Sequence, residues 1–417
     1  MPTSSGASTG STSRRLSLPD AVGTGLASTL GAGLFVALAP AAASAGDHLV
    51  WAVLLAALVM SLNAASSLTL AATDRAALGT HTHVRDRLGA PWGHLAGWAH
   101  VVGAISACAA LALTIGLHVL PDGSKVIGVV AVLAALGLHL QGIERSARAE
   151  RMIAVLVVLV VLIFATVLLT TPPVLADAPV DPEGSGGPLG VAAASGIVLF
   201  AFVGHLRLVN LRAETASPRT IHRAVAISLG VAIALYLLVT VALARTLGTG
   251  WVAARQAPLA EAAEISAWPW LGPALRIAAV LAAGGVLSSL VLAAAGDVAT
   301  MARDRHLPAA LASRHGPRQV PRRAVGVIAA FIIVSVVLVD ARQAIGFASC
   351  CILVHFALVH ASAWALEPGW RRRVIPSVGA IACVVMALLL PWQSVLAAVL
   401  VLLLGAIIGW VRHTTRE

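Results

Sequence analysis

The stretch "STLGAGLFVALAP", residues 28–40, places two glycines around an alanine in the middle of an apolar run. A helix that crosses a bilayer has to pair its backbone amides and carbonyls internally, and glycine weakens such a helix. Glycine pairs in membrane helices serve one of two purposes. They allow close packing between helices, or they mark a local break whose bare backbone groups contact a ligand.

The composition predicts an all-α polytopic membrane protein. The 417 residues are 59% hydrophobic and 11% charged, with a mean hydropathy of +0.92. Such a chain cannot hide its apolar surface in one soluble core. Its apolar runs are about 20 residues long, which is enough for a helix to cross the hydrocarbon of a bilayer.

Breaks in hydropathy predict twelve transmembrane helices. We expect them at residues 20–45, 48–72, 92–119, 125–141, 149–171, 188–211, 222–247, 272–300, 322–339, 342–364, 374–391 and 393–411. Arginine collects in the loops on one side of this arrangement, and basic residues accumulate in cytoplasmic loops. Both termini are therefore predicted to be cytoplasmic. An arginine-rich and alanine-rich chain with one lysine is typical of a high-GC bacterium, which indicates the plasma membrane.

The net charge of +10 predicts membrane lipid as a partner and no nucleic acid, because the arginines are spread over many inner loops. The four cysteines all lie in apolar segments and suggest neither a disulfide nor a metal site. No cofactor motif is recognisable, and the sequence sets no oligomeric state.

A second weak point is expected in the sixth segment. In "GIVLFAFVGHLRLVNLRAET", residues 196–215, an apolar run reaches Gly204 and is followed by His205, Arg207 and Asn210. These polar groups are costly to place against lipid. Broken helices at corresponding positions of two halves are typical of transporters built from inverted repeats, which bind substrate between the breaks.

Several motifs, in order along the chain, resemble those of the amino acid, polyamine and organocation transporter superfamily, which has a leucine-transporter-like fold. The first is the glycine core, Gly31, Ala32, Gly33, Leu34 and Phe35. The others are "GTHTHVRDRLGAPWGHLAGW" at 79–98, Phe200–Gly204, Glu214 with Pro218 and "HRAVAISL" at 222–229, and "MARDRHLP" at 301–308.

The resemblance implies a 5+5 inverted repeat, helices 1–5 and 6–10, followed by two C-terminal helices, with helices 1 and 6 broken in mid-membrane. The expected divisions are a disordered cytoplasmic tail (1–19), a first repeat (20–171), an outer loop (172–187), a second repeat (188–364), and helices 11 and 12 with a short cytoplasmic tail (365–417).

The resemblance also implies a substrate site made largely of backbone groups. Amides at the first break suit a carboxylate and opposing carbonyls suit an ammonium. The expected substrate-binding residues are Thr29, Leu30, Gly31, Ala32 and Gly33, with Phe202, Val203, Gly204 and His205 opposite. Phe202 serves either as an aromatic gate or as packing, and His205 either hydrogen-bonds the substrate or packs between helices.

Ion coupling is open between a proton and sodium. Relatives often carry a lysine where this chain has Val157, and Lys125 is the only lysine, so a lysine switch is excluded. Ser288 and Ser289 are candidates for sodium, and Asp297 and Glu214 for a proton. The alternative for the serines is packing, and for the carboxylates a solvated or arginine-paired role.

The predicted function is secondary active transport of an amino acid or related amine by alternating access. Two alternatives stay open on the same scaffold: an amino acid sensor that does not transport, and a carrier for another small amine or a nucleobase. A membrane enzyme or a channel is disfavoured, because no catalytic group or ring of pore charges converges recognisably.

Overall fold

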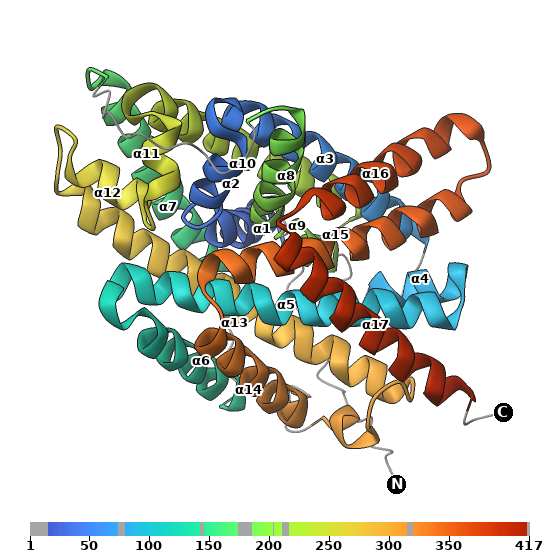
Figure 1. The fold of residues 1–417 in the computed structure, drawn as a ribbon. Coiled ribbons are helices and arrows are strands. Elements are labelled where there is room, and N and C mark those ends of the chain that lie inside the picture. The colour runs from blue at the N-terminus through green and yellow to red at the C-terminus, as the bar shows by residue number, and fades with distance from the viewer. Residues whose placement is uncertain are drawn as a thin grey trace, which may run out of the picture.

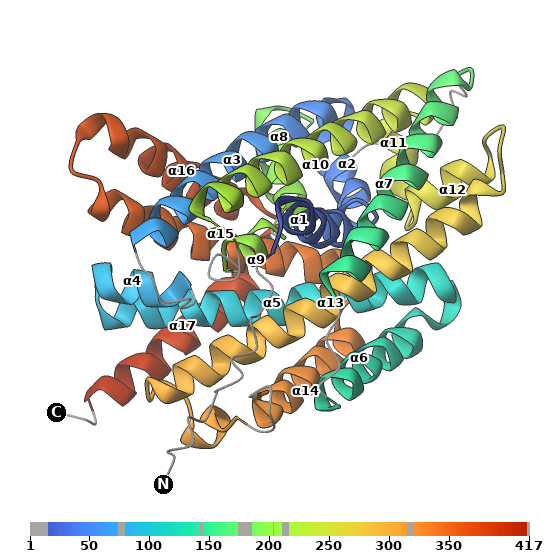
Figure 2. The same cartoon turned by 180° about the vertical axis from the view of Figure 1, so that it is seen from behind.

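The computed structural model describes residues 16–73, 80–141, 146–173, 186–202, 204–210, 217–314 and 320–414. The described residues form an all-helical structure. Ten of its helical stretches are long and apolar enough to cross a membrane. Figures 1 and 2 show the long helices α5 and α13 running side by side through the molecule, with α6 and α14 along one flank.

The helices of the first half are α1 (Leu18–Gly33), α2 (Leu38–Ala45), α3 (Leu49–Thr73), α4 (Thr80–Leu88), α5 (Ala90–Val119), α6 (Ser124–Leu140) and α7 (Ala147–Thr170). The second half contains α8 (Pro188–Leu199), α9 (His205–Asn210), α10 (Pro218–Leu247), α11 (Thr249–Ala254), α12 (Pro258–Glu264), α13 (Leu271–Arg303), α14 (Arg322–Leu338) and α15 (Ala341–Leu366). Then follow α16 (Trp370–Leu389) and α17 (Trp392–Thr414). Short 3-10 helices are η1 (Gly46–His48), η2 (Pro121–Gly123), η3 (Phe200–Phe202) and η5 (Ala309–Ala312).

Several helices begin at a side chain that caps the free amides of the first turn. The Ser17 hydroxyl accepts a hydrogen bond from the Asp20 amide at the start of α1, and Ser146 does the same for Ala149 at α7. Asp340 and Gln343 form a reciprocal capping box at α15. Such caps fix where a helix starts, because the first amides have no partner within the helix.

Burial separates central from peripheral helices. In the most apolar 18-residue stretch of α5, 78% is buried inside the protein, whereas the corresponding share is 22% in α6 and 22% in α17. The stretch from α8 to α9 and helix α15 are also largely buried. A helix that is apolar all round and packed on all sides belongs to the centre of a bundle, and one with an apolar outer face can contact lipid.

Two of the predicted segments do not form one continuous helix. In the first, α1 ends at Gly33, residues 34–37 form turns, and α2 begins at Leu38. In the other, α8 ends at Leu199, and η3 precedes α9. The turn in the first segment thus begins at residue 34, directly after Gly33. Helix α14, with 17 residues, is shorter than the ten stretches noted above.

Candidate functional site

The two interruptions lie directly against each other. A Cβ atom at Gly33 would collide with the backbone of Ala201 in η3, and one at Gly204 would collide with the carbonyl group of Ser28 in α1. Only glycine lets two backbones approach this closely. The glycines therefore allow close packing between the two segments, and this packing occurs beside both helix interruptions.

Tyr236 of α10, the only tyrosine of the sequence, reaches this junction. Its hydroxyl oxygen lies 3.3 Å from the carbonyl oxygen of Thr29 and 3.5 Å from that of Ala201. Its ring packs on Phe202, with ring centroids 4.8 Å apart. One buried hydroxyl thus faces carbonyls from both interrupted segments, and a hydroxyl proton can be donated to one of them at a time.

His205 begins α9 and is 1% exposed. Its Nδ1 lies 3.0 Å from the carbonyl oxygen of Phe202, and because a carbonyl only accepts, Nδ1 carries the proton and donates it. Its ring stacks on Phe356 of α15 at a centroid distance of 5.8 Å. The other nitrogen, Nε2, is buried and has no hydrogen-bond partner among the described residues. The geometry leaves an acceptor beside the second interruption.

The structure brings together the residues that the sequence selected at both interruptions. Thr29 and Leu30 are buried in α1, and Phe202 is fully buried in η3. The Thr29 hydroxyl donates to the Gly25 carbonyl of its own helix, at 2.8 Å. Val203 lies outside the described residues, as does the side chain of Ala32. Contact of these groups with a substrate stays a prediction.

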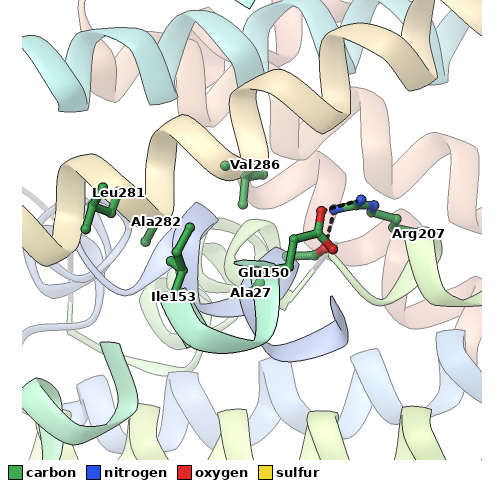
Figure 3. A pocket seen from close by; sticks show the side chains of 9 residues that line it. Ala27, Glu150, Ile153, Arg207, Leu281, Ala282 and Val286 are labelled. Carbon is green, nitrogen blue, oxygen red and sulfur yellow. Dashed lines mark hydrogen bonds and ion pairs between the residues drawn. The ribbon is translucent and has the colours of Figure 1, made fainter. Parts of the chain in front are cut away.

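An ion pair closes the gap between α7 and α9, a short distance from the junction (Figure 3). Arg207 Nη2 donates to Glu150 Oε1 at 2.6 Å, and the Thr24 hydroxyl donates to Glu150 Oε2 at 3.0 Å. Arg207 Nη1 lies 3.5 Å from the Ser28 hydroxyl. The side chain of Glu150 is 8% exposed and that of Arg207 33%. This network ties α1, α7 and α9 together by charge as well as by packing.

A small cavity lies between this network and helix α13. Its apolar wall is formed by Ala27, Ile153, Leu281, Ala282, Gly285 and Val286. Its polar wall consists of Ser28, Glu150 and Arg207. The cavity volume is about 10 Å³, roughly the space of one water molecule. An amino acid does not fit in this cavity.

Glu150, Thr24 and Tyr236 were not among the residues expected from the sequence. Glu150 lies between Arg148 and Arg151 at the start of the predicted span 149–171, and Tyr236 lies inside an ordinary apolar run. One signal was available for Glu150: it is an acidic group just before a long uncharged run, and Arg207 is a basic group at the end of another. Opposite charges at the ends of two spans are candidates for a pair.

The candidates for ion coupling occupy different surroundings. Ser288 lies with its hydroxyl 3.2 Å from His139 Nε2, and the Ser289 hydroxyl donates to the Val286 carbonyl. Asp297 accepts a hydrogen bond from His100 Nδ1 at 2.7 Å. Glu214 lies outside the described residues. Ion binding by any of them stays a prediction.

His81 of α4 approaches the same carboxylate, with Nδ1 3.8 Å from Asp297 Oδ1. Burial lowers the pKa of His81 below its ordinary value, and the negative charge of Asp297 offsets part of this effect. At neutral pH the imidazole of His81 is therefore uncharged.

The sequence matches the amino acid permease family over residues 20–415. An uncharacterised transporter of Mycobacterium tuberculosis (strain ATCC 25618 / H37Rv) is 43% identical over 404 residues, covering 96% of this chain and 91% of that protein. A transporter of Mycobacterium bovis gives the same values. The branched-chain amino acid permease of Bacillus subtilis (strain 168) is 23% identical over 422 residues, covering 92% of this chain and 90% of that protein. The chain therefore belongs to the amino acid permease family, whose members are membrane transporters.

Proposed function

We propose that the protein is a secondary transporter that carries amino acids across the plasma membrane by alternating access, with substrate bound where α1 and α2, and α8 and α9, are interrupted. One observation carries the proposal: the two interruptions pack backbone to backbone at Gly33 and Gly204 inside the protein. Non-helical backbone at membrane depth is tolerated where protein or a cavity surrounds it, and it marks the binding site in transporters of this architecture.

Backbone chemistry at the junction suits the two charged groups that all amino acids share. The Gly33 carbonyl at the end of α1 accepts from the amides of Val36 and Ala37, and this end of α1 carries the negative end of the helix dipole. The carbonyls of Thr29 and Ala201 already meet the donor group of Tyr236. We infer that a substrate ammonium approaches these carbonyls, and that its carboxylate meets the first amides of α2.

The surroundings favour a substrate with an apolar side chain. Leu30, Phe202 and Phe356 are each less than 3% exposed and lie around the two interruptions. None of them offers a charge to an ionised side chain. The name of the Bacillus subtilis relative, a branched-chain amino acid permease, supports the same class. A hydrophobic pocket discriminates by size and shape, at about 1–3 kcal/mol for each methylene.

The same proposal includes twelve transmembrane helices in two inverted five-helix repeats with two further helices, and both termini in the cytoplasm. The domain limits stay those expected from the sequence. The ion pair of Glu150 and Arg207 then lies on the cytoplasmic side of the junction, because α7 starts in a loop rich in arginine. It keeps that side closed in this arrangement, and it must open before substrate leaves.

Uptake of labelled amino acids into proteoliposomes tests the proposal. We expect saturable uptake of leucine, isoleucine or valine, with competition by unlabelled apolar amino acids and none by lysine or glutamate. Gly204→Ala should abolish uptake, and Gly230→Ala should preserve it, because a Cβ at Gly230 would meet nothing within 4 Å. Binding of these amino acids without uptake by protein that is folded and inserted would contradict transport and favour a sensor.

A further inference from the structure

A second polar cluster lies near the C-terminal end of α13, away from the two interruptions. Its centre is the hydrogen bond from His100 Nδ1 of α5 to Asp297 Oδ2 of α13, at 2.7 Å. The side chain of His100 is 13% exposed and that of Asp297 18%. Both side chains are therefore mostly shielded by the protein.

Asp297 differs from the other shielded carboxylates in the nature of its partners. Asp20 and Glu150 are each paired with an arginine, as is Asp304. Within the described ranges, Asp297 instead faces two histidines, His100 at hydrogen-bond distance and His81 at 3.8 Å. Arginine keeps its charge at every physiological pH, whereas histidine changes its charge between about pH 5 and 8. Among these four described carboxylates, Asp297 is therefore the one whose partners change charge by binding a proton in the physiological range.

The charged and titratable groups around the pair come from three helices. His81 and Arg85 belong to α4, His355 to α15, and Asp304 follows the end of α13. Arg85 is engaged with Asp304 at 2.6 Å and with Asp86 at 3.1 Å, so its charge is already paired. His355 Nδ1 donates to the Ala96 carbonyl, and its ring lies 5.0 Å from that of His100, centroid to centroid. Among the described residues, Asp297 thus has no arginine or lysine as an ion-pair partner.

The hydrogen bond defines where a proton can be added. Because the carboxylate accepts from Nδ1, neutral His100 has its lone pair on Nε2. Adding one proton there converts a neutral imidazole and a carboxylate, with a net charge of −1, into an imidazolium and a carboxylate with no net charge. The carboxylate stabilises the imidazolium, and no other bond has to form or break.

We propose that His100 and Asp297 form a proton-binding site, with His81 as the neighbour of the second carboxylate oxygen, and that a proton bound there is the co-substrate of transport. The role of the proton in transport rests on the proposed function, whereas the proton-binding site does not. The metal alternative has no support in the described part of the chain, where no three histidine, cysteine, aspartate or glutamate side chains are placed to hold an ion.

Helix α13 connects this site to the substrate junction. Ala282 lies so close to Gly31 of α1 that a Cβ there would collide with its carbonyl group, and Val286 lines the small cavity. Asp297 lies 11 residues beyond Val286, about 16 Å along one continuous helix. A change of charge that alters the packing of α13 on α4 and α5 is therefore transmitted to a wall of the substrate site.

Proton binding can be measured without any transport assay. In detergent-solubilised protein with ¹⁵N-labelled histidine, and with signals assigned by His100→Gln, the ring nitrogens of His100 should change from the neutral to the charged pattern between pH 8 and 5. In Asp297→Asn the ratio of charged to neutral His100 at a given pH in this range should fall about tenfold or more, because an opposite charge within hydrogen-bond distance is lost. Asp20→Asn, which breaks the pair with Arg151, is the control and should leave the His100 signals unchanged. A His100 ring that does not titrate in this range, or that titrates equally in Asp297→Asn, overturns the site.

Coupling is tested with labelled leucine in proteoliposomes. Leucine exchange at equal pH on both sides is measured first in wild type, Asp297→Asn and His100→Gln, and accumulation in each protein is then expressed relative to its own exchange. A gradient of one pH unit should raise accumulation up to about tenfold in wild type and leave both variants unchanged. Accumulation that still follows the gradient in both variants, or wild-type accumulation that ignores it, overturns the proton as co-substrate. Absence of leucine exchange in the wild type counts against the proposed function instead, and the histidine signals still decide the proton site.

Discussion

Glu150 and Asp297 are both carboxylates at the ends of long helices, and both are mostly shielded from water, yet their partners differ. Glu150 accepts hydrogen bonds from an arginine and a threonine, at 2.6 and 3.0 Å. Asp297 accepts one from a histidine at 2.7 Å, with a second histidine 3.8 Å away. The arginine beside Glu150 carries a permanent positive charge. The histidines beside Asp297 become positively charged only when they bind a proton.

The difference shows how similar burial can serve two purposes. A permanent ion pair across three helices favours one closed arrangement and opposes separation of the helices, because separation exposes a charge that has lost its partner. A carboxylate with imidazole partners favours different arrangements at different proton concentrations. Four substitutions, ordered from the largest expected effect to the smallest, break or sharpen this contrast.

The largest effect is expected for Arg207→Gln, which leaves the Glu150 carboxylate buried with the Thr24 hydroxyl as its remaining partner. We expect a loss of about 3 kcal/mol in stability, less than for a fully buried pair because a third of the Arg207 side chain is exposed. Glu150→Gln should reduce stability less, because the residue left unpaired is then Arg207, which is more exposed to its surroundings. The thermal unfolding midpoint in detergent measures the loss of stability in both variants. The double variant Glu150→Gln with Arg207→Gln is the control and should be more stable than Arg207→Gln alone; the reverse order would show that the pair does not act as a unit.

Gly204→Ala tests the contact between the two interruptions. The added methyl group meets the Ser28 carbonyl, and backbone cannot move away as a flexible side chain can. We expect about 1–3 kcal/mol of destabilisation from overpacking together with loss of leucine uptake. In the control, Gly230→Ala, stability should stay level or rise, because alanine is favoured over glycine inside a helix. Wild-type uptake by Gly204→Ala would mean that the junction is not the binding site.

Tyr236→Phe removes one hydroxyl at the junction and keeps the ring contact with Phe202. We expect a loss of about 1 kcal/mol in stability, the usual contribution of one intramolecular hydrogen bond, and a change in the apparent affinity for substrate. The matched control lies one turn further along α10, where Thr240 has a buried hydroxyl without a hydrogen-bond partner among the described residues. Thr240→Val should be neutral or stabilising in the same unfolding measurement. Equal losses in the two variants would argue against a special role for Tyr236.

The smallest effect is expected for His81→Gln and concerns pH. Burial lowers the pKa of His81 from its ordinary value of 6.5, so the unfolded chain binds a proton more readily than the folded protein does. Above pH 6.5 the residue is neutral in both states and contributes nothing. As the pH falls below 6.5, stability decreases, and the decrease stops once the pH is below the folded pKa.

Unfolding midpoints at pH 7.5 and 5.5 should therefore differ less in His81→Gln than in wild type. The exposed His48 serves as the control residue, and His48→Gln should keep the acid sensitivity of the wild type. An unchanged difference in His81→Gln would place the acid sensitivity elsewhere in the chain.

Much of the architecture was predictable from local pattern. Apolar runs of about 20 residues predicted membrane helices, and the glycines near residues 31–33 and 204 predicted interruptions in their vicinity. The exact turn, at residues 34–37, was not predictable, because both glycines lie inside α1, which ends at Gly33 against η3 of a distant segment. Asp297 was recognisable as a titratable group from the sequence. Its histidine partners, His100 and His81, were not predictable, because they lie on other helices far away in the chain.

Sequence alone determined the class of the molecule, because the cost of exposing backbone and charge to lipid acts on each segment separately and leaves its mark in composition. Tertiary structure decided which groups meet. Glu150 and Arg207 are 57 residues apart in the chain, His100 and Asp297 are 197 apart, and Tyr236 lies 207 residues from Thr29. Helix packing sets these pairs, since a side chain's partner depends on the facing helix and its rotation, which no local pattern encodes.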